Sequence, residues 1–165
     1  MIQPGDVIPA IPVKHVTAAG VTDETADKVL GGGRVVFFAV PGAFTPTCHA
    51  NHLPGFVDNA SKFSAAGVDR IVCGATNDHH VLKAWAEATG ALGSIEFLSD
   101  GNGALAKAMG LDKDLSKAGM GTRFSRLAMI IDNGRVERLF LQEEPGVTTS
   151  GAPSVLMALE TARSK

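Results

Sequence analysis

Residues 34–42 read Arg-Val-Val-Phe-Phe-Ala-Val-Pro-Gly. Val35–Val40 is apolar without a break and consists mostly of β-branched and aromatic side chains, which is typical of a strand buried on both faces. Pro41 and Gly42 end this strand, because proline lacks the N–H that a ladder needs and glycine favours turns. A strand with two buried faces requires a helical layer on each side of its sheet. The run therefore predicts the centre of an α/β domain.

The residues that follow this strand predict a parallel crossover. A helix is expected over about 46–66, with Gly67 as its terminator and Pro54 as a kink. Residues 68–75 then form a second buried strand. Because a strand–helix–strand unit joins parallel neighbours in one sheet, residues 34–75 predict a parallel pair of strands.

The rest of the chain alternates strands and helices in the same way. Asn77-Asp78 caps a helix whose expected apolar face is Val81, Leu82, Trp85 and Ala88. Asn133-Gly134 predicts a hairpin turn, because both residues tolerate a positive φ. The other expected elements are a hairpin around Gly20, a strand over 95–98, a helix over 103–109, strands over 127–131 and 136–141, and a helix over 153–163. The result is one three-layer α/β domain over residues 1–165, with a central mixed sheet and helices on both faces.

Composition excludes several classes of protein. The chain has 165 residues, a formal net charge of −2, 45% hydrophobic and 19% charged residues. This charge disfavours nucleic acid and acidic membrane surfaces as partners, and the apolar runs are too short to span a bilayer. The first residues contain neither a basic segment nor an apolar segment of an export signal, so a cytoplasmic protein is expected. Two cysteines are too few for a disulfide scaffold, which favours a functional thiol.

The candidate for that thiol is Cys48. Thr45 followed by Pro46 reads as the N-cap and first residue of a helix, which places Cys48 in the first helical turn. Unpaired amide N–H groups and the positive end of the helix dipole there stabilise a thiolate over a thiol. The alternative is a buried cysteine that packs as a small apolar residue. Its polar neighbours Thr47 and His49 favour the functional interpretation.

A resemblance to a known family enters at this segment. Residues 41–48 read Pro-Gly-Ala-Phe-Thr-Pro-Thr-Cys and residues 52–56 read His-Leu-Pro-Gly-Phe, which resembles the active-site signature of type II (atypical, peroxiredoxin-5-like) peroxiredoxins. The match continues through residues 77–85, 97–101 and 121–123. The resemblance implies a thioredoxin-like fold and reduction of hydrogen peroxide and organic hydroperoxides. It also implies an external thiol reductant and no bound cofactor or metal.

The resemblance assigns expected roles to individual residues. Cys48 is similar to the peroxidatic cysteine, and Thr45 to the threonine that hydrogen-bonds the peroxide and the sulfur. Pro41 looks like the proline that shields the thiolate from water. Arg126 matches the family arginine that stabilises the transition state, although the nearby Arg123 is the other candidate.

The oxidised cysteine, a sulfenic acid, must be reduced by a thiol. Part of the family has a resolving cysteine before an Ala-Pro pair, but residues 148–153 here read Thr-Thr-Ser-Gly-Ala-Pro. The other cysteine, Cys73, is a possible resolving residue in some family members. Its predicted place in a buried strand favours a packed core thiol instead. We therefore expect a one-Cys cycle in which glutathione, glutaredoxin or thioredoxin regenerates Cys48.

Other interpretations of the same residues stay open. His52, four residues after Cys48, could be a metal ligand, a base or a packing residue. A Cys–His acyl-transfer hydrolase is disfavoured because the chain has no Gly-x-Cys-x-Gly elbow. A peroxide sensor or thiol holdase would use the same cysteine as a peroxidase. A homodimer is expected from the resemblance alone.

Overall fold

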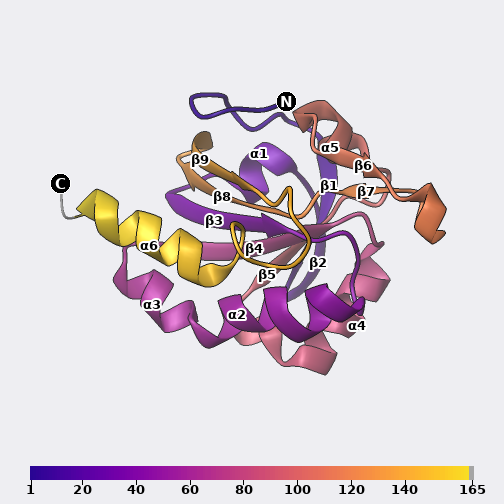
Figure 1. The fold of residues 1–165 in the computed structure, drawn as a ribbon, viewed down its shortest axis with the longest axis horizontal. Coiled ribbons are helices and arrows are strands. Elements are labelled where there is room, and N and C mark those ends of the chain that lie inside the picture. Colours follow the sequence, from indigo (N-terminus) through magenta and orange to yellow (C-terminus); the bar gives the residue numbers. More distant parts are fainter. Residues whose placement is uncertain (164–165) are drawn as a thin grey trace.

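The computed structural model describes residues 1–163 and holds a seven-stranded mixed sheet in the order β2-β1-β5-β4-β3-β8-β9 (Figure 1). The strands of this sheet are β1 (Pro12–Thr17), β2 (Gly20–Thr25), β3 (Arg34–Ala39), β4 (Arg70–Ala75), β5 (Glu96–Ser99), β8 (Leu127–Asp132) and β9 (Arg135–Leu141). A separate ladder joins β6 (Asp112–Asp114) to β7 (Thr122–Phe124). The helices are α1 (Ala26–Val29), α2 (Leu53–Asp58), α3 (Ala60–Ala65), α4 (His79–Thr89), α5 (Ala104–Met109) and α6 (Ala152–Arg163). A π-helical segment covers Cys48–His52, and 3₁₀ turns cover Ala91–Gly93 and Ser116–Ala118.

The central strand is β3, as its sequence predicts. It pairs in parallel with β4, where Phe37 lies opposite Val72, and antiparallel with β8. Its side chains alternate between two apolar clusters, with Val36 and Phe38 in one and Val35 and Phe37 in the other. The parallel crossover predicted over residues 34–75 is confirmed.

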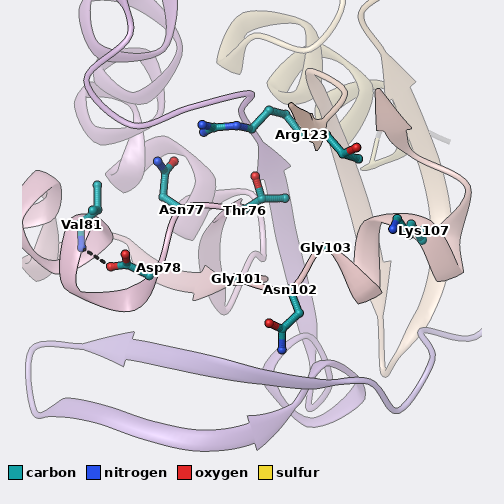
Figure 2. A pocket seen from close by; sticks show the side chains of 10 residues that line it. Thr76, Asn77, Asp78, Val81, Gly101, Asn102, Gly103, Lys107 and Arg123 are labelled. Atoms are coloured by element: carbon teal, nitrogen blue, oxygen red, sulfur yellow. Dashed lines mark hydrogen bonds between the residues drawn. The ribbon is translucent and has the colours of Figure 1, made fainter. Parts of the chain in front are cut away.

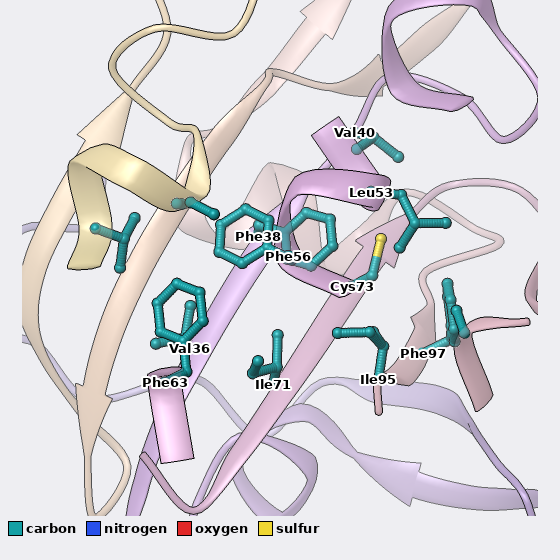
Figure 3. Packing of buried hydrophobic residues seen from close by; sticks show 14 of the residues in the cluster. Val36, Phe38, Val40, Leu53, Phe56, Phe63, Ile71, Cys73, Ile95 and Phe97 are labelled. Carbon is teal, nitrogen blue, oxygen red and sulfur yellow. The ribbon is translucent and has the colours of Figure 1, made fainter. Parts of the chain in front are cut away.

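The two apolar clusters lie on opposite faces of the sheet and define three layers. Residues of α2, α3, α4 and α6 pack against one face, and residues of α1 and α5 pack against the other (Figure 1). On the first face, Phe38 of β3 stacks on Phe56 of α2 with ring centroids 4.1 Å apart (Figure 3). This layered arrangement confirms the predicted fold class.

The helix predicted over 46–66 is interrupted twice, which corrects the sequence interpretation. Leu53 N donates to the Cys48 carbonyl five residues earlier, which forms the π-helical turn directly before Pro54. Pro54 has no N–H and its ring would clash with the carbonyl four residues before it, so the wider turn accommodates the proline. Asn59, with φ −105° and ψ 10°, then separates α2 from α3.

The turns follow their sequence signals, whereas some element bounds do not. Asn133 (φ 48°) and Gly134 (φ 82°) form the turn between β8 and β9, as predicted. Asp78 caps α4 by accepting from Val81 N, also as predicted. Ala88, however, is exposed, which corrects the predicted apolar face of α4. The buried residues of this helix are Leu82, Trp85 and Ala86, so Ala86 lies in the core where Ala88 was expected. Within residues 1–163, no helix is both long and apolar enough to cross a bilayer.

Candidate active site

Cys48 lies beyond the carboxyl end of β3, where the chain passes through a tight loop into the π-helical segment. Phe44, a non-glycine residue with φ 60°, turns this loop. Ala43 N donates to Asn77 Oδ1 over 2.9 Å, which fixes the loop to the segment between β4 and α4. His49 N donates to the Thr45 carbonyl, so helical hydrogen bonding begins at Thr45. The Cys48 side chain is thereby placed in the first turn, and it is fully buried.

The hydroxyl of Thr45 does not act as the predicted N-cap. Its Oγ1 donates to the Gly42 carbonyl over 2.6 Å and so closes the loop before Cys48. The loop geometry favours this bond because Phe44 brings Gly42 and Thr45 into a turn. A hydroxyl that donates to a carbonyl retains lone pairs with which it can accept a hydrogen bond. Thr45 is thus oriented by its own loop.

Arg126 contacts the thiol directly. Its Nη2 donates to Cys48 Sγ over 2.9 Å, and its Nη1 donates to His52 Nδ1 over 2.9 Å. His52 Nε2 in turn donates to the Ser150 carbonyl over 2.9 Å. A guanidinium has donors only, so Nδ1 must be the acceptor and the imidazole proton must reside on Nε2. The four residues form one continuous chain of hydrogen bonds that ends at the sulfur.

His52 is held neutral in this chain. Burial lowers the pKa of His52 to about 3, and the neighbouring Arg126 charge also lowers it, whereas the bond to the Ser150 carbonyl acts in the opposite direction. Both ring nitrogens are engaged, and neither bonds to the sulfur. This arrangement disfavours His52 as a base or metal ligand. Of the three predicted roles, a packing residue remains, and His52 additionally orients the Arg126 guanidinium through its Nδ1.

Pro41 and Arg126 border a pocket whose lining does not include Cys48 itself. The pocket has a volume of about 260 Å³. The other lining residues are Lys113, Leu115, Gln142, Glu143, Glu144, Pro145 and Gly146. Such a pocket has room for a small peroxide near the guanidinium that contacts Cys48 Sγ.

Arg123, the other candidate cation, has a different place. Its Nη1 donates to the Pro41 carbonyl over 3.3 Å and its Nε donates to the Met120 carbonyl over 2.8 Å. It also borders a second cavity of about 380 Å³, together with Thr76 and Asn77 (Figure 2). Arg126, and not Arg123, is therefore the arginine that donates to the sulfur.

Cys73 lies inside β4 among apolar side chains such as Leu53 and Phe97 (Figure 3). It is fully buried, and both cysteines are free thiols. Burial raises the pKa of the Cys73 thiol well above its ordinary value, and the neighbouring Cys48 raises it further. A thiol held protonated is a poor nucleophile. The predicted place of Cys73 in a buried strand is confirmed, whereas its role in the redox cycle stays a prediction.

Two features near the site carried no recognisable signal in the sequence. Trp85 Nε1 donates to His49 Nδ1 over 2.9 Å, and the exposed Phe44 ring stacks on the His49 ring at 5.6 Å. Gln142, buried after β9, bonds to several groups of the segment that ends at Ser150. Trp85 and His49 are 36 residues apart, so no local pattern predicts their contact. The Gln142 bonds span two to eight residues, within a loop that has no recognisable motif.

Comparisons with known proteins identify relatives of this chain. The Redoxin family model matches residues 3–156. Peroxiredoxin-2C of Oryza sativa subsp. japonica is 45% identical over 128 residues, which cover 78% of this chain and 79% of that protein. The chloroplastic Peroxiredoxin-2E-2 of the same organism is 46% identical over 139 residues, or 82% of this chain. The chain spans 61% of the length of that second relative.

A solved structure extends the agreement to the fold. The crystal structure of reduced Prx3 from Vibrio vulnificus in complex with hydrogen peroxide superposes with a TM-score of 0.90 at 41% sequence identity. The alignment covers 96% of this chain and 99% of that chain. The thioredoxin-like fold implied by the resemblance is confirmed. The chain belongs to the redoxin family and, within it, to the peroxiredoxins.

Proposed function

We propose that this protein is a thiol-dependent peroxidase that reduces hydrogen peroxide and organic hydroperoxides through Cys48. The observation that carries the proposal is the 2.9 Å contact between Arg126 Nη2 and Cys48 Sγ. A guanidinium in this place stabilises a thiolate on a buried sulfur, and it can also donate to a peroxide oxygen that gains charge. Pro41 borders the pocket that Arg126 also lines, which supports a role for its apolar ring in shielding the site from water.

The reaction takes place at the sulfur. The Cys48 thiolate forms an S–O bond with one peroxide oxygen while the O–O bond breaks. The second oxygen leaves with the bonding electron pair as hydroxide or alkoxide and takes up a proton. Sulfur is oxidised by two electrons to a sulfenic acid, and the peroxide is reduced by two. Arg126 supplies hydrogen bonds that strengthen as the leaving oxygen becomes negative. The Thr45 hydroxyl, whose proton goes to the Gly42 carbonyl, can accept a hydrogen bond from the peroxide O–H.

Regeneration requires two equivalents of an external thiol. The first attacks the sulfenic acid, forms a mixed disulfide with Cys48 and releases water. The second thiol attacks this disulfide and restores the thiolate. We propose glutathione with glutaredoxin, or thioredoxin, as the reductant, and no bound cofactor. The burial of Cys73 in β4 supports a one-Cys cycle, because pairing with Cys48 would require β4 to open locally.

A steady-state assay of peroxide consumption tests this proposal. The protein is supplied with glutathione and glutaredoxin in one series and with thioredoxin and its reductase in another. We expect turnover with at least one system in the wild type and none in Cys48→Ser, with Cys73→Ser as the matched cysteine control. A single oxidation of Cys48 without turnover in either series would contradict the peroxidase and indicate a peroxide sensor.

Two further properties are proposed on the same basis. A homodimer is supported by the exposed Phe44, which is 50% exposed at the active-site loop and offers an apolar contact. Sedimentation velocity of the wild type and Phe44→Ser distinguishes a dimer from a monomer.

A reducing compartment such as the cytoplasm is supported by the two free thiols. Fractionation of cells with an antibody to the protein tests the location.

A further inference from the structure

Gln142 lies directly after β9 and is only 8% exposed. Its amide makes five hydrogen bonds to the segment that follows it, residues 143–150, which we call the strap. Oε1 accepts from Thr148 N and Ser150 N, each over 3.0 Å, and from Ser150 Oγ over 3.2 Å. Nε2 donates to the Glu144 carbonyl over 3.0 Å and to Thr148 Oγ1 over 2.9 Å. One side chain thus organises both ends of the strap.

The strap leads directly to the reactive sulfur. Its last residue, Ser150, is fully buried and presents its carbonyl to His52 Nε2. His52 Nδ1 accepts from Arg126 Nη1, and Arg126 Nη2 donates to Cys48 Sγ. The Gln142 backbone also contacts the same arginine, because Gln142 N donates to the Arg126 carbonyl over 2.9 Å. Gln142 is therefore linked to the Arg126 backbone directly and to its guanidinium through Ser150 and His52.

We propose that Gln142 is a positioning residue for peroxide reduction, an inference that rests on the proposed peroxidase function. The Oε1–Ser150 N bond fixes the peptide whose carbonyl accepts from His52. This carbonyl holds the His52 ring with Nδ1 toward Arg126, and the ring holds the guanidinium with Nη2 toward the sulfur. Gln142 touches neither the sulfur nor the peroxide, so its effect is transmitted through His52.

The exposure of the strap explains why its order depends on the Gln142 side chain. Residues 143–146, 148 and 149 are exposed and contribute little to the core. Because exposed segments gain little from apolar burial, their internal hydrogen bonds determine how well they are ordered. The strap also supplies Glu143, Glu144, Pro145 and Gly146 to the wall of the 260 Å³ pocket. Loss of the amide is therefore expected to disorder the strap and with it the Ser150 carbonyl that accepts from His52.

The test compares two reactions of the same thiol. In Gln142→Leu we expect the rate constant for hydrogen peroxide to fall about tenfold, because hydrogen-bond donors act on the transition state only when preorganised. Alkylation of Cys48 by iodoacetamide, measured where its rate no longer rises with pH, is expected to change less than about twofold, because it needs no leaving-oxygen donor. Gln3→Leu is the matched control, since Gln3 is an exposed glutamine. Peroxide reduction in Gln142→Leu at the wild-type rate would overturn the inference.

A double-mutant cycle identifies the route of the effect. His52→Phe retains an aromatic ring between Phe38 and Phe56 and removes both ring nitrogens. If Gln142 acts through His52, Gln142→Leu has no further effect on the peroxide rate in the His52→Phe background. An equal fall in both backgrounds would show an independent, merely structural role and overturn the inference.

Thr148→Val serves if Gln142→Leu does not fold. Thr148 is exposed, and its hydroxyl accepts from Gln142 Nε2, so the variant weakens the same network at the surface. We expect a fall of about threefold in the peroxide rate with unchanged alkylation. No fall would overturn the inference. A wild-type protein that does not turn over peroxide at all would instead refute the proposed function, so the two failures are distinguishable.

Discussion

Removal of the Arg126 guanidinium provides the most direct test of the site. Arg126→Ala deletes the donor that lies 2.9 Å from Cys48 Sγ and leaves His52 Nδ1 without its partner. The substitution removes a charge and two hydrogen bonds at one place. Arg126→Lys is the informative companion, because a lysine retains the charge but cannot reproduce the planar fork that reaches both His52 and the sulfur.

The expected magnitude separates two effects of the guanidinium. Unit charges about 4 Å apart attract by about 4 kcal/mol at an effective dielectric constant of about 20. Much of this attraction already acts on the resting thiolate and affects how many thiols are ionised. Only the part that acts on the leaving oxygen lowers the barrier, and loss of one such donor typically costs about 10²- to 10³-fold in rate. We therefore expect the peroxide rate constant of the ionised Arg126→Ala thiol to fall in that range.

The assay is stopped-flow reaction with hydrogen peroxide, performed beside alkylation with iodoacetamide at a pH where the alkylation rate has reached its plateau. At that pH each variant is fully ionised, so the difference between the two reactions reports on the leaving oxygen. Arg138→Ala is the control, because Arg138 is exposed and packs over the Phe140 ring. Equal losses in the two reactions of Arg126→Ala would refute the transition-state role of the guanidinium.

Three further predictions concern the neighbouring residues. Thr45→Val removes the hydroxyl that donates to the Gly42 carbonyl, and we expect about a tenfold fall in both peroxide reduction and alkylation; a fully active variant would exclude Thr45 from the mechanism. After one peroxide turnover without reductant, mass spectrometry of a dimedone-treated wild type should find the adduct on Cys48 and no disulfide to Cys73; an intramolecular disulfide would contradict the one-Cys cycle. His52 has a folded-state pKa of about 3 against an ordinary 6.5, so the unfolded chain binds more protons between these values. The free energy of unfolding should therefore fall by up to about 1.4 kcal/mol per pH unit as the pH decreases from about 6 to 4. Urea titrations at a series of pH values should show that the unfolding free energy of His52→Phe depends less steeply on pH than that of the wild type.

Local patterns in the sequence were sufficient for most of the fold. The run Val35–Val40 predicts the buried central strand because alternate side chains enter two apolar clusters. Asn133-Gly134 predicts its hairpin, and Asp78 predicts the start of α4, because each depends on neighbours within a few residues. The place of Cys48 in a first helical turn follows from Thr45-Pro46 for the same reason.

The interruption of the predicted 46–66 helix shows where such patterns are insufficient. Pro54 predicts a disturbance, but a kink, a π-helical turn or a helix end would each relieve the clash. The structure adopts the π-helical turn and then ends α2 at Asn59, whose Nδ2 donates to the Gly55 carbonyl. The orientation of the Thr45 hydroxyl likewise depended on the shape of the Phe44 turn.

From its amino acids alone, the chain reveals its layers and its family signature and predicts Cys48 as the reactive thiol. Folding in three dimensions establishes which groups surround that sulfur. Arg126 reaches Cys48 across 78 residues, and Ser150 reaches His52 across 98 residues. Short-range preferences act over a few residues, whereas the choice of Arg126 over Arg123 and the role of Gln142 depend on how distant strands and loops pack. The candidate thiol is therefore recognisable from its neighbours in the sequence, whereas the arrangement of the groups around it depends on long-range contacts.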